Sequence, residues 1–200
     1  MNKRRVEIVF DVACVLSYLV FTRYSRAAQR YRESGGEVET VFLPFQHRPD
    51  ADPAGEPLFE THKRDRGEAA AREVQTMTTF GAEDGLKVDF GRVVSTNTFD
   101  AHRLIAQAAA QGRGERMAER LFRAYFTDAL NVADHDILVM LAEETGVRMS
   151  DGGATELRAE LDRVRGLGFT ADSVPAFRFD TGLTLSGEQP EEAFFAAFEA

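Results

Sequence analysis

Residues 6–18 read VEIVFDVACVLSY, and this stretch decides the fold. Its first five residues are rich in Val, Ile and Phe and are typical of a buried strand. Apolar residues then recur at spacings of three and four over residues 17–33, which predicts a helix. Cys14, the only cysteine of the chain, therefore lies where a strand gives way to a helix. A second strand is predicted over 37–43, and the order strand, helix, strand implies parallel pairing through a right-handed crossover.

Cys14 stands just before the first turn of the predicted helix, where backbone N–H groups lack partners and the helix dipole is positive. Both effects favour the thiolate, which is the nucleophilic form of cysteine, so we expect a reactive thiol at Cys14. Ser17 follows three residues later, and we expect its hydroxyl to donate a hydrogen bond to the sulfur. The alternative is structural, because a free cysteine often behaves as a small core residue and Val15 and Leu16 beside it are apolar.

Composition and charge exclude several classes of protein. A chain of 200 residues with 44% hydrophobic and 28% charged residues is long enough, and ordinary enough, for one soluble domain with a sizeable insertion. The net charge of −9 argues against nucleic acid as a partner, because phosphate binding needs a cationic surface. No apolar stretch approaches the roughly 20 residues of a membrane span. The basic start is not followed by a signal-peptide pattern, and one cysteine cannot form an internal disulfide, so we expect a cytoplasmic protein.

The rest of the chain predicts a helical middle between two ends that contain strands. Residues 59–168 show helical patterns almost throughout and no strand pattern. Strand character returns over 173–179, and a turn that contains glycine leads to another short strand, as in a hairpin. A last helix is predicted over 191–199. We therefore predict an α/β fold in which residues 1–58 and 169–200 form one discontinuous domain and 59–168 form an all-helical insertion.

Pro175 is a second candidate for the site, because it opens a strand late in the chain. The Val174–Pro175 bond can adopt the cis form at modest cost, and a cis proline at a site leaves the preceding backbone free to pair with a peptide or thiol substrate. The commoner role is that of an ordinary proline at a strand start. Taken alone this motif is weak; combined with Cys14 at the other end of the chain it is much stronger.

The four histidines show no metal-binding spacing with one another or with Cys14, so we predict no metal site. His102 lies in a predicted helix over 101–111, where a structural hydrogen-bonding role is the first expectation and a role near substrate the alternative. We expect His47 and Arg48, in the loop after the second strand, to be solvated like most loop charges. The alternative is that this loop reaches a bound ligand.

Several segments together carry a resemblance to a known family. They are DVACVLSY (11–18), NTFDAHRL (97–104), AYF (124–126), the 134–138 segment, VPAF (174–177) and SGEQP (186–190). Through them the chain resembles the DsbA-like branch of the thioredoxin superfamily, in particular its bacterial FrnE-type members. The resemblance covers nearly the whole chain. It implies a thioredoxin fold with an all-helical insertion and a thiol–disulfide oxidoreductase whose nucleophile, Cys14, lies next to Pro175 in cis.

The chain departs from this family at one position that matters for the chemistry. Members with redox activity carry two cysteines as Cys-x-x-Cys, and here Ser17 stands in place of the second. A mixed disulfide on Cys14 must therefore be resolved by an external thiol, such as glutathione or another small thiol. We expect Cys14 and Ser17 to be the catalytic residues. Val174 and Pro175 are the expected platform for the substrate backbone, and His102 is a further candidate because it lies in a closely matching segment.

Two other functions stay open at this point. The resemblance extends to kappa-class glutathione transferases and 2-hydroxychromene-2-carboxylate isomerases, which carry Ser at the position of Cys14 and use its hydroxyl to activate glutathione. A transferase or isomerase would use Cys14 or Ser17 to orient a small thiol. A degenerate member would instead bind a peptide or small molecule without catalysis. The expected partner is a thiol or disulfide substrate, with no tightly bound cofactor, and the sequence leaves both a monomer and a homodimer open.

Overall fold

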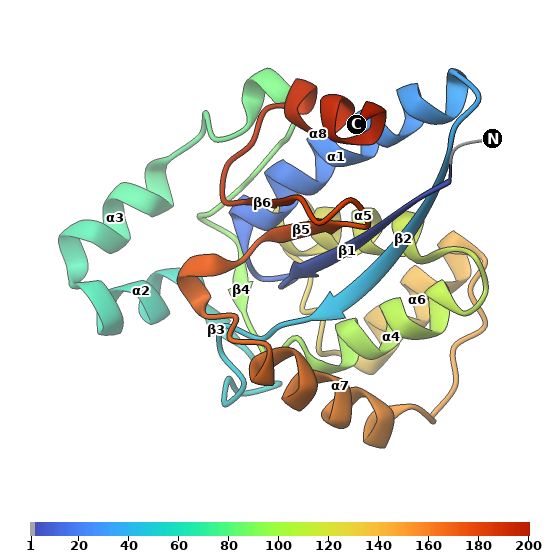
Figure 1. Ribbon diagram of the computed structural model, residues 1–200. Coiled ribbons are helices and arrows are strands. Elements are labelled where there is room, and N and C mark those ends of the chain that lie inside the picture. The colour runs from blue at the N-terminus through green and yellow to red at the C-terminus, as the bar shows by residue number, and fades with distance from the viewer. Residues whose placement is uncertain (1–2) are drawn as a thin grey trace.

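The computed structural model describes residues 3–200 and places a four-stranded sheet at the centre of the molecule, with helices on both faces (Figure 1). The strands, in the spatial order β2-β1-β5-β6, are β1 (Lys3–Phe10), β2 (Glu37–Pro44), β5 (Ala176–Phe179) and β6 (Thr184–Ser186). β1 and β2 are parallel, as predicted, whereas β5 pairs antiparallel with β1 and β6 antiparallel with β5. The predicted α/β class and the predicted C-terminal hairpin are both confirmed.

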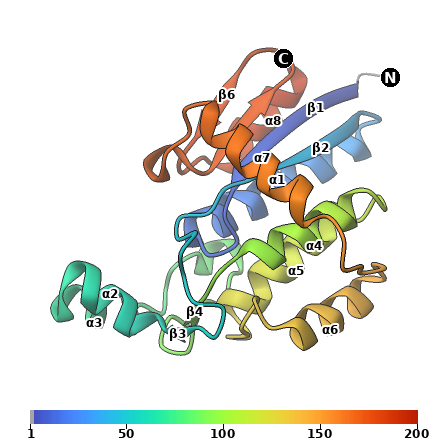
Figure 2. The same cartoon turned by 90° about the horizontal axis from the view of Figure 1, so that it is seen from below.

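Helices account for most of the remaining chain within residues 3–200. They are α1 (Val15–Glu33), α2 (Leu58–Arg66), α3 (Glu68–Thr76), α4 (Phe99–Ala109), α5 (Gly114–Phe126), α6 (His135–Thr145), α7 (Ala154–Gly166) and α8 (Glu191–Glu199). α1 and α8 pack together on one face of the sheet, and α7 lies on the other face (Figures 1 and 2). α2 and α3 pack on each other and project away from the sheet (Figure 2). Within the described residues no helix has both the length and the apolar character needed to cross a membrane.

The central strand β1 is buried on both faces, and its side chains alternate between two hydrophobic clusters. Val6, Ile8 and Phe10 point into the larger cluster, which also contains the buried faces of α1, α5 and α8. Val9 points the opposite way, into a smaller cluster that includes Val164 of α7. The run of apolar residues before Cys14 is therefore the strand that both layers of helices cover.

The middle of the chain differs from prediction in two details. A two-residue strand, β4 (Val94–Ser95), pairs with β3 (Glu56–Pro57), although no strand was expected between residues 59 and 168. Two paired residues are too few to leave a periodic pattern in a sequence. α7 lies inside the predicted insertion and packs directly on β2. The division of the chain into a discontinuous domain and an insertion stays a prediction.

The carboxyl ends of the parallel strands meet at one edge of the sheet. The backbone N–H of Phe45 donates to the carbonyl of Phe10 at 3.0 Å, which joins the residues that leave β2 and β1. Val9 is paired with Ala176, so Pro175 comes next to the end of β1 on the neighbouring strand. The segment with Cys14, the loop after β2 and the start of β5 therefore converge at this edge. In open α/β sheets the carboxyl ends of strands are where ligands usually bind.

Candidate functional site

Cys14 is the N-cap residue of α1, with extended backbone angles of φ −96° and ψ 111°. The backbone N–H of Ser17 donates to the Cys14 sulfur at 3.4 Å, which satisfies one of the free donors of the first helical turn. The N–H of Cys14 itself donates to the carbonyl of Asp11 at 3.1 Å, so a tight turn links β1 to α1. The thiol thus lies at a helix start, where the sequence predicted it.

The pKa of the Cys14 thiol is shifted in the direction opposite to the one that the sequence predicted. Burial raises the pKa of the Cys14 thiol, and the negative charge of Asp11 raises it further. The neighbouring hydroxyl and N–H of Ser17 lower the pKa, but they do not offset the loss of water around the sulfur. The backbone N–H groups of the helix start lower the pKa of the thiol, as expected, but burial outweighs them, so the predicted net shift toward the thiolate was wrong.

Ser17 is almost completely buried, at 1% exposure, one turn into α1. Its hydroxyl was expected to donate to the Cys14 sulfur. Within the described residues Ser17 Oγ lacks the geometry of a completed hydrogen bond, although it lies close enough to the sulfur to lower the pKa of the thiol. A buried hydroxyl without a partner loses free energy relative to one in water. The arrangement leaves a donor near the sulfur that is available to a charged or ligand-bound form of the thiol.

Asp11, three residues before the cysteine, is a fully buried carboxylate with several hydrogen-bond donors around it. Its Oδ2 accepts from the backbone N–H of His47 at 2.8 Å and lies 3.2 Å from His47 Nδ1. Its Oδ1 accepts from the N–H of Ala13 at 3.3 Å and lies 3.4 Å from His102 Nε2. Burial alone would raise the pKa of Asp11, but the hydrogen bonds from His102 and His47 hold it well below its usual range. Asp11 is therefore an anion inside the protein.

His102 lies on α4 and is buried beside the end of β1. Its Nε2 is 3.0 Å from the carbonyl oxygen of Phe45 as well as 3.4 Å from Asp11 Oδ1. This geometry matches an Nε2–H that donates to both acceptors. His102 thus contacts the carboxylate behind Cys14, and within residues 3–200 it makes no hydrogen bond to the sulfur. We name Asp11, His47 and His102 the carboxylate cluster.

The matched segment 97–104 has a local structural reason for its residues. Asn97 Oδ1 accepts from Gln46 Nε2 at 3.0 Å and from the N–H of Phe99 at 2.9 Å. Asn97 Nδ2 donates to the carbonyl of Pro49 at 2.8 Å. One amide therefore fixes the loop after β2 to the start of α4, which holds His47 and His102 on either side of Asp11.

The Val174–Pro175 peptide bond is cis. Both residues are buried, and Val174 packs in the smaller cluster with Val9 and Phe45. The carbonyl of Pro175 accepts from the N–H of Gly187 at 3.0 Å. The sheet register brings Pro175 to the same edge as Cys14, while the Val174 side chain is occupied in the core.

The sequence did not identify Asp11 as a member of the site, and it favoured a solvated His47 over one near a ligand. His47 was expected to be solvated, yet its backbone and its ring both contact Asp11 and its side chain is only 27% exposed. The available signal was an aspartate directly after an apolar strand, since a charge at the end of a buried strand needs partners. Its two imidazole partners lie 36 and 91 residues away in the chain, as their numbers show, and a sequence pattern does not reveal such pairs.

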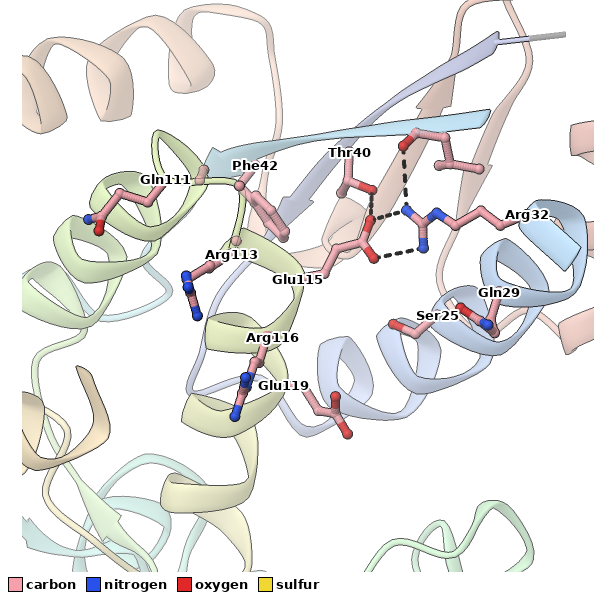
Figure 3. Close-up of a pocket in the computed structure, with 14 residues that line it drawn as sticks. Ser25, Gln29, Arg32, Thr40, Phe42, Gln111, Arg113, Glu115, Arg116 and Glu119 are labelled. Carbon is pink, nitrogen blue, oxygen red and sulfur yellow. Dashed lines mark hydrogen bonds and ion pairs between the residues drawn. The ribbon is translucent and has the colours of Figure 1, made fainter. Parts of the chain in front are cut away.

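A hollow of about 900 Å³ lies away from Cys14 (Figure 3). It opens between the C-terminal half of α1, the middle of β2 and the start of α5. Its side is formed by an ion pair of Arg32 with Glu115 at 2.6 Å, and Glu115 also contacts Thr40 (Figure 3). Its first α1 residue, Ser25, is about 16 Å along the helix from Cys14 at 1.5 Å per residue. This hollow is not the thiol site.

A smaller hollow of about 510 Å³ lies beside the carboxylate cluster. Its lining includes His47, Arg48, Arg64 and Ser95. Both arginines already have carboxylate partners, Arg48 with Asp65 and Arg64 with Glu56. Within residues 3–200 no group of His, Cys, Asp and Glu side chains has the arrangement of a metal site.

Comparisons with known proteins agree on one family. The model of the DSBA-like thioredoxin domain matches residues 5–165. A probable DsbA oxidoreductase from Streptomyces coelicolor is similar in structure, with 28% identity, a TM-score of 0.82, and coverage of 98% of this chain and 88% of that one. The cytosolic disulfide reductase DsbM from Pseudomonas aeruginosa shares the fold at 19% identity and a TM-score of 0.57, covering 98% of this chain and 97% of that one.

Among curated proteins, the uncharacterized protein YwbO of Bacillus subtilis is 26% identical over 143 residues. The match takes in 71% of this chain and 66% of that protein, so the chain spans just under two thirds of its relative's length.

Proposed function

We propose that this chain, which belongs to the DSBA-like thioredoxin domain family, acts on thiols and disulfides. It would do so through a mixed disulfide on its single cysteine. The observation that carries the proposal is the position of Cys14 as N-cap of α1, with the Ser17 N–H directed at its sulfur. The buried, unpartnered Ser17 hydroxyl beside it supports the same role. We retain Cys14 and Ser17 as the proposed catalytic residues and Val174–Pro175 as the proposed substrate platform. The FrnE-type assignment also stays a prediction.

The proposed reaction has two exchange steps. In the first, the Cys14 thiol loses its proton to water, and the thiolate attacks one sulfur of a substrate disulfide. A bond forms between Cys14 and that sulfur, and the other substrate sulfur leaves as a thiolate. In the second, an external thiolate attacks the mixed disulfide, takes the substrate sulfur as a new disulfide and releases Cys14. Ser17 has no sulfur with which to perform this second step internally.

The raised pKa of Cys14 counts against rapid exchange, and the proposal is therefore restricted to slow exchange. A higher pKa leaves a smaller fraction of thiolate at neutral pH, but the nucleophilicity of each thiolate increases with its pKa. We therefore propose a slow exchange with a small-molecule disulfide rather than rapid oxidation of proteins. Glutathione or another small thiol is the proposed external thiol. A cytoplasmic location suits the scheme, because a reducing compartment supplies the external thiol.

Intact-mass spectrometry of the protein after incubation with glutathione disulfide tests this proposal. We expect one glutathionyl group on the wild-type protein, and we expect free glutathione to remove it as glutathione disulfide. Cys14→Ala is the control, because it removes the sulfur and leaves the rest of the site in place. A wild-type protein that stays unmodified at pH 8, while remaining folded, would overturn the exchange mechanism.

The raised pKa of Cys14 favours a second candidate function, which is the binding of a small thiol without exchange. In that case the site would hold a small thiol by hydrogen bonds, as a transferase, an isomerase or a simple binding protein would. Calorimetric titration of glutathione into Cys14→Ala distinguishes the two. Saturable binding that survives the loss of the sulfur supports this alternative, and binding that is lost with the sulfur contradicts it.

A further inference from the structure

A third hollow, of about 450 Å³, lies between α4 and α7 beside the end of β2, and we name it the α4–α7 hollow. The three elements contact one another around it. Apolar side chains form much of its wall: Phe42 and Pro44 from β2, Ile105 and Ala106 from α4, and Leu157 from α7. Its volume lies within the range of about 300–1,000 Å³ that is typical of small-molecule sites. An apolar wall of this kind suits the apolar body of a small ligand.

His102 also lines the α4–α7 hollow, and one of its ring nitrogens is available to a ligand. Nε2 lies 3.0 Å from the Phe45 carbonyl, which can only accept, so Nε2 carries the hydrogen. In the neutral ring Nδ1 is then an acceptor, and it makes no hydrogen bond within residues 3–200. Among these residues Ser17 Oγ is the one fully enclosed side-chain N or O atom without a partner, so Nδ1 of His102 is not sealed from its surroundings.

A carboxylate without a partner stands at the mouth of the hollow. Glu156 is an exposed residue in the first turn of α7, and it forms no ion pair with any residue of the described part of the chain. Glu160, one turn further along α7, is instead paired with Arg163 at 2.7 Å. Glu156 is therefore a negative charge that a bound cation can neutralise.

The hydrogen-bond donors of the lining side chains are already engaged. Arg103 Nε lies 3.1 Å from a carboxylate oxygen of Asp100, and Arg103 Nη1 donates to the Asp151 carbonyl at 2.8 Å. Gln107 Nε2 donates to the Ser150 carbonyl at 2.9 Å. The polar groups that remain for a ligand, the Glu156 carboxylate and Nδ1 of His102, are both acceptors. A ligand that matches them must donate hydrogen bonds.

We propose that the α4–α7 hollow is a binding site for a small amine with an apolar body. The apolar body packs against Phe42, Ile105 and Leu157, and the ammonium group pairs with Glu156 at the mouth. A carboxylate of the same shape would meet two acceptors and no free side-chain donor, and the net charge of −9 also opposes an anion. The inference goes beyond the proposed function and does not depend on the chemistry of Cys14.

Two probes with the same aromatic body and opposite charges test the proposal. Phenethylamine carries an ammonium group and phenylpropionate a carboxylate, and each is titrated into the full chain by heteronuclear NMR. We expect saturable shifts of backbone amides on α4 and α7 with phenethylamine. We expect the Kd of phenylpropionate to be about three- to fivefold weaker, as for a partly exposed ion pair. The free N–H groups at the start of α7 are the one nearby feature that favours an anion, so equal or tighter binding of phenylpropionate would overturn the proposal.

Three variants locate the site. Ala106→Trp fills the hollow from an exposed position of α4, and we expect it to abolish phenethylamine binding. Ala159→Trp is the matched control, because Ala159 is exposed on α7 and does not line the hollow. Glu156→Gln alters an exposed side chain, so the fold should be unaffected, and we expect it to weaken phenethylamine about three- to fivefold without weakening phenylpropionate.

Two results would reject the site outright. One is binding of phenethylamine that persists in a folded Ala106→Trp protein or is insensitive to Glu156→Gln, and the other is no saturable shift up to about 10 mM phenethylamine. Failure here is distinguishable from failure of the proposed function, because neither probe contains sulfur. The glutathione disulfide experiment reports bond formation at Cys14, whereas these titrations report the α4–α7 hollow alone.

Discussion

His102 Nε2 lies 3.4 Å from Asp11 Oδ1, and both side chains are 1% exposed. This contact joins α4 to the end of β1, although the two residues are 91 positions apart in the chain by their numbers. The same nitrogen lies 3.0 Å from the Phe45 carbonyl, at the end of β2. The imidazole of His102 therefore connects α4 to the ends of β1 and β2, where the candidate site lies.

Replacing His102 with leucine should destabilise the protein substantially. The substitution removes the donor for two buried acceptors, Asp11 Oδ1 and the Phe45 carbonyl. Loss of one partner of a buried charged contact typically costs about 3–5 kcal/mol. Urea denaturation at pH 7 measures the change in the free energy of unfolding. His135→Leu, an exposed position at the start of α6, is the control and should change it by less than about 0.5 kcal/mol.

The contribution of Asp11 to stability should depend on pH with a definite sign. Its pKa is lowered in the folded protein, so it binds protons more weakly folded than unfolded. The stabilisation is therefore complete above the unfolded pKa of about 3.9 and is lost as pH falls through the lower, folded value. The difference in the free energy of unfolding between the wild-type protein and Asp11→Asn should stay constant from about pH 7 to 5. It should become smaller below about pH 4. A gap that widens on acidification would contradict this assignment.

Much of the architecture could be predicted because it has a local signature. The apolar run before Cys14 and the helical spacing after it are patterns within a few residues, and they correspond to β1 and α1. The last helix, Glu191–Glu199, has the predicted bounds, since Pro190 marks its start. Local patterns of this kind survive in a sequence because each element buries one face of its own.

The electrostatic state of the site could not be predicted in the same way. The helix start at Cys14 is a local feature and indicated a thiolate, whereas the burial of the sulfur and the charge of Asp11 are tertiary effects that reverse it. His47 was assigned to solvent because a loop histidine usually is solvated, and only the fold brings its ring within 3.2 Å of Asp11. Ionisation depends on neighbours from four separate elements, and spacing in the sequence carries no information about them.

Cys14→Ser should keep the fold and abolish the chemistry. Serine is a better N-cap residue than cysteine, because its oxygen is a stronger acceptor for the free N–H groups of the first turn. Cys14 already accepts from the Ser17 N–H, so the replacement preserves this contact. We expect the free energy of unfolding to stay equal or rise by about 0.5–1 kcal/mol, while all alkylation by iodoacetamide is lost. A large loss of stability would instead assign the sulfur a packing role.

Ser17→Ala should separate stability from reactivity. The Ser17 hydroxyl is buried without a hydrogen-bond partner within residues 3–200, so its removal should stabilise the fold by about 1 kcal/mol. The hydroxyl also lowers the pKa of Cys14, so the same change should raise that pKa and slow alkylation at pH 7. Ser25→Ala, on the same helix but distant from the sulfur, is the matched control and should leave the alkylation profile unchanged. Higher stability together with slower alkylation would indicate that Ser17 supports the reactivity of Cys14 and destabilises the fold. An unchanged alkylation rate would show that Ser17 is not part of the site.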